Sequence, residues 1–65
     1  MSFGENLRSL RKAKGLKQDE LAKEFNVSAK TISHWEKGYS EPSITQLLTL
    51  AKFFDITLDD LLDNP

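Results

Sequence analysis

The chain has 65 residues, of which 38% are hydrophobic and 29% charged, and its net charge is −1. This length accommodates one small domain, so we expect residues 1–65 to form a single unit. The absence of cysteine excludes disulfides and cysteine-ligated zinc and makes a reducing cytoplasm the expected location. Since no apolar run approaches the roughly 20 residues that span a bilayer, no membrane association is expected.

The small net charge conceals a division along the chain. Residues 1–40 hold eight Lys and Arg against five Asp and Glu, whereas residues 41–65 hold one against five. The first part therefore carries +3 and the second part −4. This division predicts one basic face and an acidic end that is turned away from it.

Apolar residues recur at helical spacing in five segments, and none of the sequence has the alternation of a strand. The pattern therefore predicts an all-α fold. The predicted helices are residues 3–14, 18–25, 29–37, 44–54 and 58–62.

The second and third of these helices, within residues 18–37, are joined by a tight turn. Asn26 tolerates the left-handed backbone that ends a helix, and Ser28 is a good N-cap for the helix that follows. One helix thus ends and the next begins within about three residues, which is the turn length of a helix-turn-helix.

The predicted helix at residues 29–37 has two unlike faces. Ile32 and Trp35 share one side and are expected to anchor the helix in the core. The opposite side has two cations, a hydroxyl, an imidazole and no acid, supplied by Lys30, Ser33, His34 and Lys37. Such a donor-rich surface suits an anionic partner with many acceptors; ordinary solvated helix surface is the alternative.

Two charged residues, Arg11 and Glu36, lie at the margins of apolar stripes on different helices. A half-buried charge without a partner is costly, so we predict that these two side chains form an ion pair. The alternative is that they are unrelated surface charges.

The helix at residues 44–54 contains more apolar residues than one stripe needs. The expected core stripe is Ile44, Leu47, Leu48, Ala51 and Phe54. Leu50 and Phe53 are then left over. Together with Leu62 of the last predicted helix, they are predicted to form an exposed apolar patch for a protein partner or for self-association; the alternative is that the core covers them.

Three stretches, LRSLRKAKGLKQDELA, VSAKTISHWEKG and PSITQLLTLAKFFDITLDDLL, carry a family resemblance. Over nearly its whole length the chain resembles the helix-turn-helix domain of phage repressors and Cro proteins, also called the xenobiotic-response-element type. The resemblance implies a compact five-helix bundle that places helix 29–37 in the major groove of double-stranded DNA. It also implies a transcriptional regulator, a repressor, that binds its operator as a homodimer.

The resemblance assigns roles by position. The positions that commonly meet base edges are Ala29, Lys30, Ser33 and His34. The positions that contact the phosphate backbone are Gln18, Lys37, Tyr39 and Ser40. Gln18 also braces the recognition helix, and Arg11 with Glu36 matches a frequent internal ion pair. Since lysine binds both bases and phosphates, a phosphate contact remains the alternative for Lys30.

The chain departs from the family pattern at three positions. Lys17 stands where a threonine-like cap is usual, Asn26 stands where glycine is usual, and Ala29 is shorter than the polar residue that many relatives have. The first two departures do not threaten the fold, whereas the short Ala29 limits base recognition there to a thymine methyl.

An enzyme is not expected, because the chain offers one histidine, no cysteine and no convincing pair of carboxylates. Asp59 and Asp60 are adjacent and therefore point to different sides of a helix. We expect no metal, no cofactor and no small-molecule substrate. The competing interpretations are a protein-interaction module with the same fold and the DNA-binding head of a longer regulator.

Overall fold

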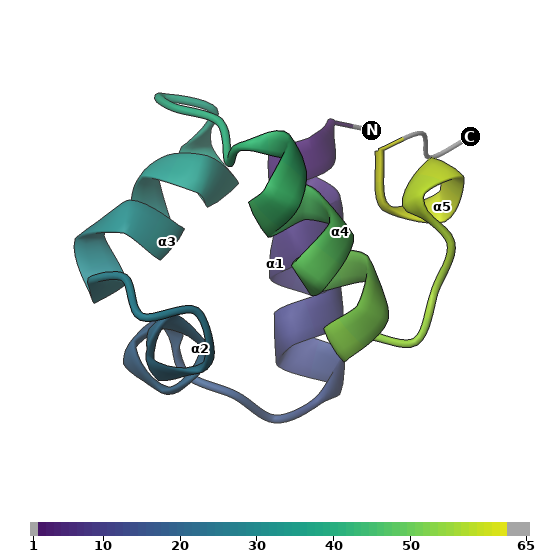
Figure 1. The fold of residues 1–65 in the computed structure, drawn as a ribbon. Helices are drawn as coiled ribbons and strands as arrows, with labels where there is room; N and C mark the ends of the chain where they lie inside the picture. The colour runs from purple at the N-terminus through teal and green to yellow at the C-terminus, as the bar shows by residue number, and fades with distance from the viewer. Residues whose placement is uncertain (1, 63–65) are drawn as a thin grey trace.

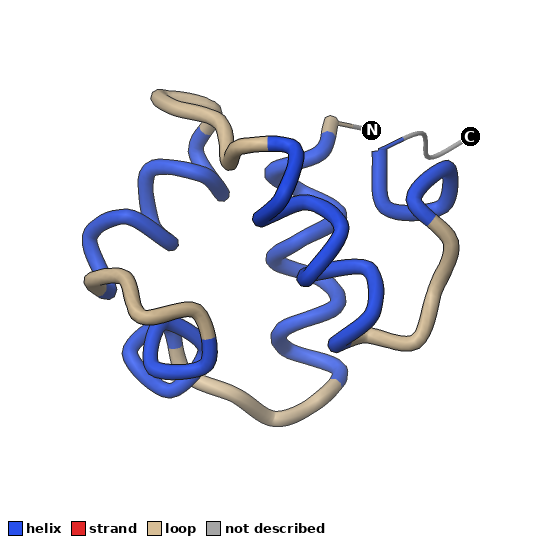
Figure 2. The backbone as a smooth tube through the Cα atoms, in the orientation of Figure 1, coloured by secondary structure: helices blue, strands red, loops and turns tan. Residues whose placement is uncertain are grey.

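A computed structural model describes residues 2–62, which fold into five α-helices without a strand (Figures 1 and 2). The helices are α1 (Phe3–Ala13), α2 (Gln18–Glu24), α3 (Ala29–Lys37), α4 (Ile44–Phe53) and α5 (Leu58–Leu62). The all-α prediction is confirmed, and every predicted helix end lies within one residue of the observed end. None of these helices, all within residues 2–62, has the length and apolar character that crossing a membrane requires.

The helices start at residues whose side chains satisfy free backbone N–H groups. The hydroxyl oxygens of four N-cap residues each accept a hydrogen bond from the N–H group three residues later: Ser2, Ser28, Ser43 and Thr57. At the start of α2 the Glu20 carboxylate accepts a bond of 2.7 Å from the Lys17 N–H instead. At α1 the reciprocal bonds from the Ser2 backbone N–H and hydroxyl hold the pKa of Glu5 below its ordinary value.

Four helices, α1 to α4, end in the same way. The backbone has a positive φ two residues beyond α1, α2 and α4, at Gly15, Asn26 and Asp55, and one residue beyond α3, at Gly38. The N–H of the following residue then donates to a carbonyl of the last helical turn, as in the Schellman motif. These left-handed residues let the chain reverse sharply, so the connections between helices stay short.

Each helix contributes one fully buried side chain to the core. These side chains are Leu7, Leu21, Ile32, Leu50 and Leu61. Trp35 is also buried, so the prediction that Ile32 and Trp35 anchor the third helix is confirmed. In this arrangement α3 packs on α1 and α2, while α5 packs on α1 and α4 (Figure 1).

The predicted core stripe of α4 is confirmed at Leu47, Ala51 and Phe54 but is wrong at Ile44 and Leu48. Leu50 is fully buried, whereas Ile44 is 74% and Leu48 53% exposed. Two overlapping sets of residues have helical spacing in this apolar segment, and packing of α4 on the rest of the core selects the set with Leu47, Leu50, Ala51 and Phe54. The predicted self-association patch is therefore also wrong, because it included Leu50.

Gly4 marks a close approach between the start of α1 and the end of α3. A Cβ atom at this position would lie 2.4 Å from the Glu36 carbonyl oxygen and 2.7 Å from the Trp35 carbonyl oxygen. These atoms belong to backbone and cannot rotate away. The absence of a side chain at residue 4 therefore lets α1 support the end of α3.

We expect Gly4→Ala to destabilise the fold by about 1–3 kcal/mol, since the added methyl group forces two packed helices apart. Thermal unfolding followed by circular dichroism measures the effect. Ser9→Ala, at an exposed position of the same helix, is the control and should leave the melting temperature nearly unchanged. Equal melting temperatures for Gly4→Ala and the unmodified protein would show that the contact is not tight.

Candidate nucleic-acid interface

The turn between α2 and α3 fixes the orientation of α3 relative to α2. Asn26 takes a positive φ of 56°, and the Val27 N–H donates to the Ala22 carbonyl at 3.2 Å. Ser28 then caps α3 by accepting a bond of 3.1 Å from the Thr31 N–H. The two helices are thus joined by a turn whose backbone groups are satisfied locally, so α3 is held at a defined angle to α2.

The face of α3 opposite Ile32 and Trp35 lies at the molecular surface. Lys30 is exposed, and Ala29, Ser33 and His34 are half-buried. This is the set that the sequence assigns to base contacts, and the structure brings its members together on one surface of one helix. The surface has no carboxylate of its own, so hydrogen-bond donors dominate it.

The end of α3 holds a cluster of donors around an exposed tyrosine. The Tyr39 N–H donates to the His34 carbonyl at 2.9 Å, and the two rings lie 5.5 Å apart between centroids. The ammonium group of Lys37 lies 5.8 Å from the centroid of the Tyr39 ring. The cluster gathers a phenol, an ammonium and an imidazole where the helix ends, and Ser40 follows it directly at an exposed position.

Tyr39 differs from its counterparts in the other helix endings. The residues at the same place after α1, α2 and α4 are Leu16, Val27 and Ile56, and all three pack against the core. Tyr39 is 72% exposed instead. In the Schellman motif the residue at this place frequently makes an apolar contact with the preceding helix. The exposed Tyr39 ring does not make that contact and is available to a partner.

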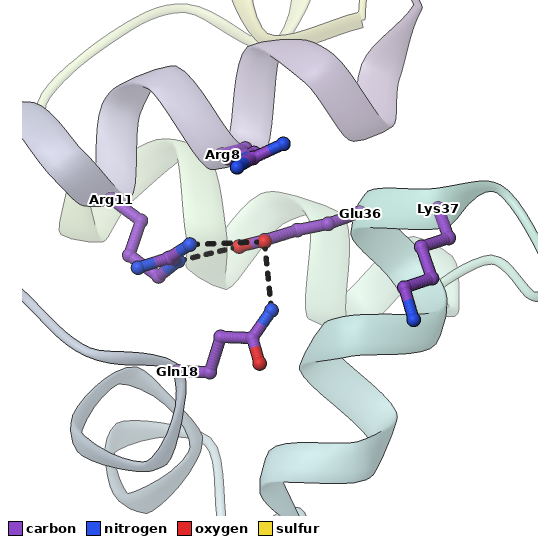
Figure 3. Close-up of a pocket in the computed structure, with 5 residues that line it drawn as sticks. All are labelled: Arg8, Arg11, Gln18, Glu36 and Lys37. Carbon is purple, nitrogen blue, oxygen red and sulfur yellow. Dashed lines mark hydrogen bonds and ion pairs between the residues drawn. The ribbon is translucent and has the colours of Figure 1, made fainter.

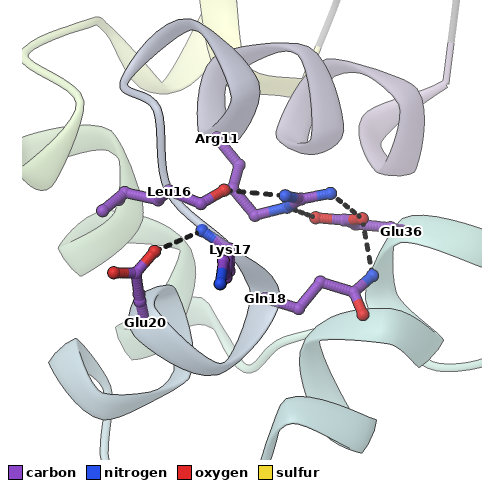
Figure 4. A network of polar contacts seen from close by, with 6 residues as sticks. All are labelled: Arg11, Leu16, Lys17, Gln18, Glu20 and Glu36. Carbon is purple, nitrogen blue, oxygen red and sulfur yellow. Dashed lines mark hydrogen bonds and ion pairs between the residues drawn. The ribbon is translucent and has the colours of Figure 1, made fainter.

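Behind this surface, the Glu36 carboxylate joins three parts of the fold (Figure 4). Its Oε2 accepts a bond of 2.6 Å from Arg11 Nε, and its Oε1 accepts bonds from Arg11 Nη2 at 3.1 Å and from Gln18 Nε2 at 3.0 Å. Arg11 Nη1 donates in turn to the Leu16 carbonyl at 2.8 Å. The structure therefore pairs Arg11 with Glu36 and makes Gln18 a brace between α2 and α3.

The same residues line a recess of about 200 Å³ among α1, α2 and α3 (Figure 3). Its lining consists of Arg8, Arg11, Gln18, Glu36 and Lys37. Sequence reasoning missed Arg8 as a member of this site. The available signal was its spacing, because Arg8 stands one helical turn before Arg11 and so shares a side of α1 with it.

Among residues 2–62, His, Cys, Asp and Glu side chains form no group of three that could hold a metal ion. The acidic Asp59 and Asp60 lie on α5, across α1 from α3 (Figure 1). The cations around the recess and the acids of α5 are therefore on different parts of the molecule, as the division of charge along the chain predicts.

Glu36→Gln should lower the free energy of unfolding by about 2 kcal/mol, because the Arg11 guanidinium is buried and would lose its counter-charge. For a domain of this size such a loss lowers the melting temperature by roughly 8–16 °C. Glu24→Gln, at an exposed position of α2, is the matched control. An unchanged melting temperature in Glu36→Gln would show that the pair contributes nothing to stability.

Comparison with known proteins gives a family and several relatives. A family model described as helix-turn-helix matches residues 7–61. The chain is 44% identical over 64 residues to the HTH-type transcriptional activator BcrR of Enterococcus faecalis, covering 98% of this chain and 31% of BcrR. It is 38% identical over 55 residues to the uncharacterized HTH-type transcriptional regulator MJ0272 of Methanocaldococcus jannaschii, covering 85% of this chain and 83% of that protein. The chain thus spans about a third of BcrR and most of MJ0272.

Solved structures agree with the fold. The P22 c2 repressor in complex with a synthetic operator superposes with a TM-score of 0.91 at 35% identity, covering 100% of this chain and 98% of that one. The restriction-modification controller protein C.AhdI of Aeromonas hydrophila superposes with a TM-score of 0.81 at 37% identity, covering 92% of this chain and 91% of that one. The five-helix arrangement described above is therefore the arrangement of known helix-turn-helix proteins.

Proposed function

From the premise that the chain belongs to the helix-turn-helix family, we propose that it binds double-stranded operator DNA and regulates transcription in the cytoplasm. The observation that carries the proposal is the outward face of α3, which is donor-rich, free of acid and held from behind by Ile32 and Trp35. The P22 c2 repressor, which shares this fold, is solved in complex with an operator. Binding rather than catalysis is the role proposed for this surface.

In the proposed complex, α3 lies in the major groove with its N-terminal half nearest the bases. Lys30 donates to guanine O6 and N7, and His34 and Ser33 offer shorter donors beside it. The methyl group of Ala29 suits contact with a thymine methyl. These four residues select the sequence, because they occupy the exposed side of the helix that enters the groove.

Phosphate contacts hold the helix at its depth in the groove. We assign them to Gln18 at the start of α2 and to Lys37, Tyr39 and Ser40 at the end of α3. Lys37 and Tyr39 belong to the donor cluster described above, and Ser40 follows it directly. Contacts at this end of α3 fix the orientation of the protein on the duplex without reading its sequence.

A second copy of the chain is the partner proposed for the exposed face of α4. Ile44 and Leu48 stand one turn apart there, and residues 44–51 carry no charge. Such a face can meet a copy of itself without repulsion, and a twofold dimer matches the symmetry of an operator made of two half-sites. We further propose repression as the outcome when the operator overlaps a promoter.

Selection of bound duplexes from a random DNA pool tests the proposed function. We expect enrichment of one short sequence, bound in gel-shift assays in the presence of competitor DNA. Affinity should fall steeply as salt rises, since neutralised phosphates release counterions. Failure to retain any duplex at low salt would contradict the proposal and favour a protein-interaction module.

Lys30→Ala tests base recognition by α3. We expect a loss of about 1–3 kcal/mol in binding and a relaxed preference at one base pair of the selected sequence. Lys52→Ala removes an exposed cation from α4 and serves as the control. A uniform loss on all sequences would assign Lys30 to the phosphate backbone instead.

Leu48→Lys tests the dimer, because a charge on an apolar contact surface should oppose association. Sedimentation should show a dimer for the unmodified protein on a duplex with two half-sites about one DNA turn, roughly 34 Å, apart. Leu48→Lys should bind there as independent monomers, whereas Ser9→Lys, with the same charge on α1, should still dimerise. Dimers of Leu48→Lys as stable as the unmodified ones would exclude this face.

A further inference from the structure

His34 is the side chain of the proposed DNA-binding face whose residue type changes charge near neutral pH. It is the single histidine of the chain, which has no cysteine. A histidine side chain gains or loses its proton between about pH 5 and 8, whereas lysine and arginine stay charged throughout that range. The ring is half-buried on the outward side of α3. Protonation of this one ring therefore changes the charge of the proposed DNA-binding face.

The neighbours of His34 on its own helix include two cations and no available acid. Lys30 stands four residues before it and Lys37 three residues after it, so both lie beside it on the same side of α3. The one carboxylate of the helix belongs to Glu36, and side chains of α1 and α2 engage both of its oxygens (Figure 4). In the free protein the two lysines therefore oppose a third positive charge at His34.

The helices packed against α3, which are α1 and α2, supply no counter-charge to the imidazole (Figure 1). Within residues 2–62 the only ion pair joins Arg11 to Glu36, so no carboxylate of the described chain lies within ion-pair distance of His34. The other charged side chains of these two helices are all exposed: Glu5, Arg8, Lys12, Asp19, Glu20, Lys23 and Glu24. A counter-charge for a protonated His34 must therefore come from a partner.

The Tyr39 ring is a neighbour that suits a protonated imidazole. The His34 and Tyr39 rings lie 5.5 Å apart between centroids, at an angle of 59°. The face of an aromatic ring attracts a cation, and the Lys37 ammonium already lies 5.8 Å from the centroid of the Tyr39 ring. Tyr39 thus offers a positive imidazole a place to stay at the end of α3 once the repulsion from the lysines is removed.

A DNA duplex removes that repulsion. Its dense negative charge favours positive groups near its grooves, and phosphates that pair with Lys30 or Lys37 cancel the charges that oppose protonation. A protonated imidazole also has two N–H donors, where the neutral ring has one. Guanine O6 and N7 present acceptors to such donors in the major groove. Each of these effects favours the protonated ring in the complex over the protonated ring in the free protein.

We infer that DNA binding is coupled to protonation of His34: on binding, a proton moves from the solvent to an imidazole nitrogen, and affinity rises as the pH falls. The inference rests on the proposed function and goes beyond it, because it makes regulation by this protein sensitive to pH. Since the complex holds the proton more tightly than the free protein, the gain in affinity is largest at low pH. It disappears when rising pH removes the proton from the complex.

The first test is the pH dependence of binding to the duplex selected from the random pool. As the pH falls from about 7.5 to 5.5, log affinity should rise by at most about 1 per pH unit, the slope for one proton. His34→Gln stays neutral and His34→Lys stays charged, so the affinities of both variants should be nearly constant across the range. Lys52→Gln, which loses a charge on α4, should keep the slope of the unmodified protein.

The second test counts the protons by calorimetry. The unmodified protein is titrated with the duplex at about pH 6.5, near the middle of the range of histidine, in two buffers with different enthalpies of ionisation. The difference between the two heats should correspond to uptake of up to about one proton per chain. His34→Gln should take up none. An N-terminally acetylated protein should keep the uptake, which excludes the terminal amine as its source.

The outcomes separate this inference from the proposed function. If the unmodified protein binds DNA with an affinity that stays constant or falls as the pH is lowered, or if His34→Gln keeps the same slope and proton uptake, the inference is overturned. If no duplex is bound at low salt at any pH in the range, the proposed function fails and this inference fails with it. A slope and an uptake that His34→Gln abolishes and Lys52→Gln retains support both.

Discussion

The Glu36 carboxylate is the interaction on which the rest of the arrangement depends. It lies on α3, accepts two bonds from Arg11 of α1, and accepts a third from Gln18 of α2. A half-buried carboxylate persists only where donors satisfy it, so these bonds require the three helices to meet at one place. That requirement fixes the direction of α3, because Glu36 sits at the margin between its buried and exposed sides. Ile32 and Trp35 then face inward, and Lys30, Ser33 and His34 face outward.

The end of α3 combines structural and functional demands within a few residues. Gly4 allows α1 to touch the last carbonyls of the helix, and Gly38 lets the chain turn away immediately afterwards. The residue after that turn is Tyr39, which is exposed where the other helix endings bury an apolar side chain. Stability is supplied by the backbone at this point, so the side chains of Lys37, Tyr39 and Ser40 remain available for a partner.

Local signals in the sequence predicted the helices and their ends well. Ser28, Asn26 and Gly38 act through their own backbone and caps, and these effects do not depend on distant residues. The pairing of Arg11 with Glu36 was also accessible, since both charges sit beside apolar stripes. The buried face of α4 could not be predicted in this way, because Ile44, Leu48 and Leu50 all fit a helical stripe. Tertiary packing decides which of them is buried. Gly4 was missed for a related reason: its role arises from a neighbouring helix whose distance the sequence does not give.

The proposal to be tested is that α3 contacts DNA with the face opposite its buried core residues. Backbone amide NMR of the labelled protein, titrated with the selected duplex, tests this claim residue by residue. The largest shifts should occur at Lys30, Ser33 and His34, with smaller shifts at the end of α3 and none on α5. Shifts gathered on α4 and α5, with the amides of α3 unmoved, would contradict it.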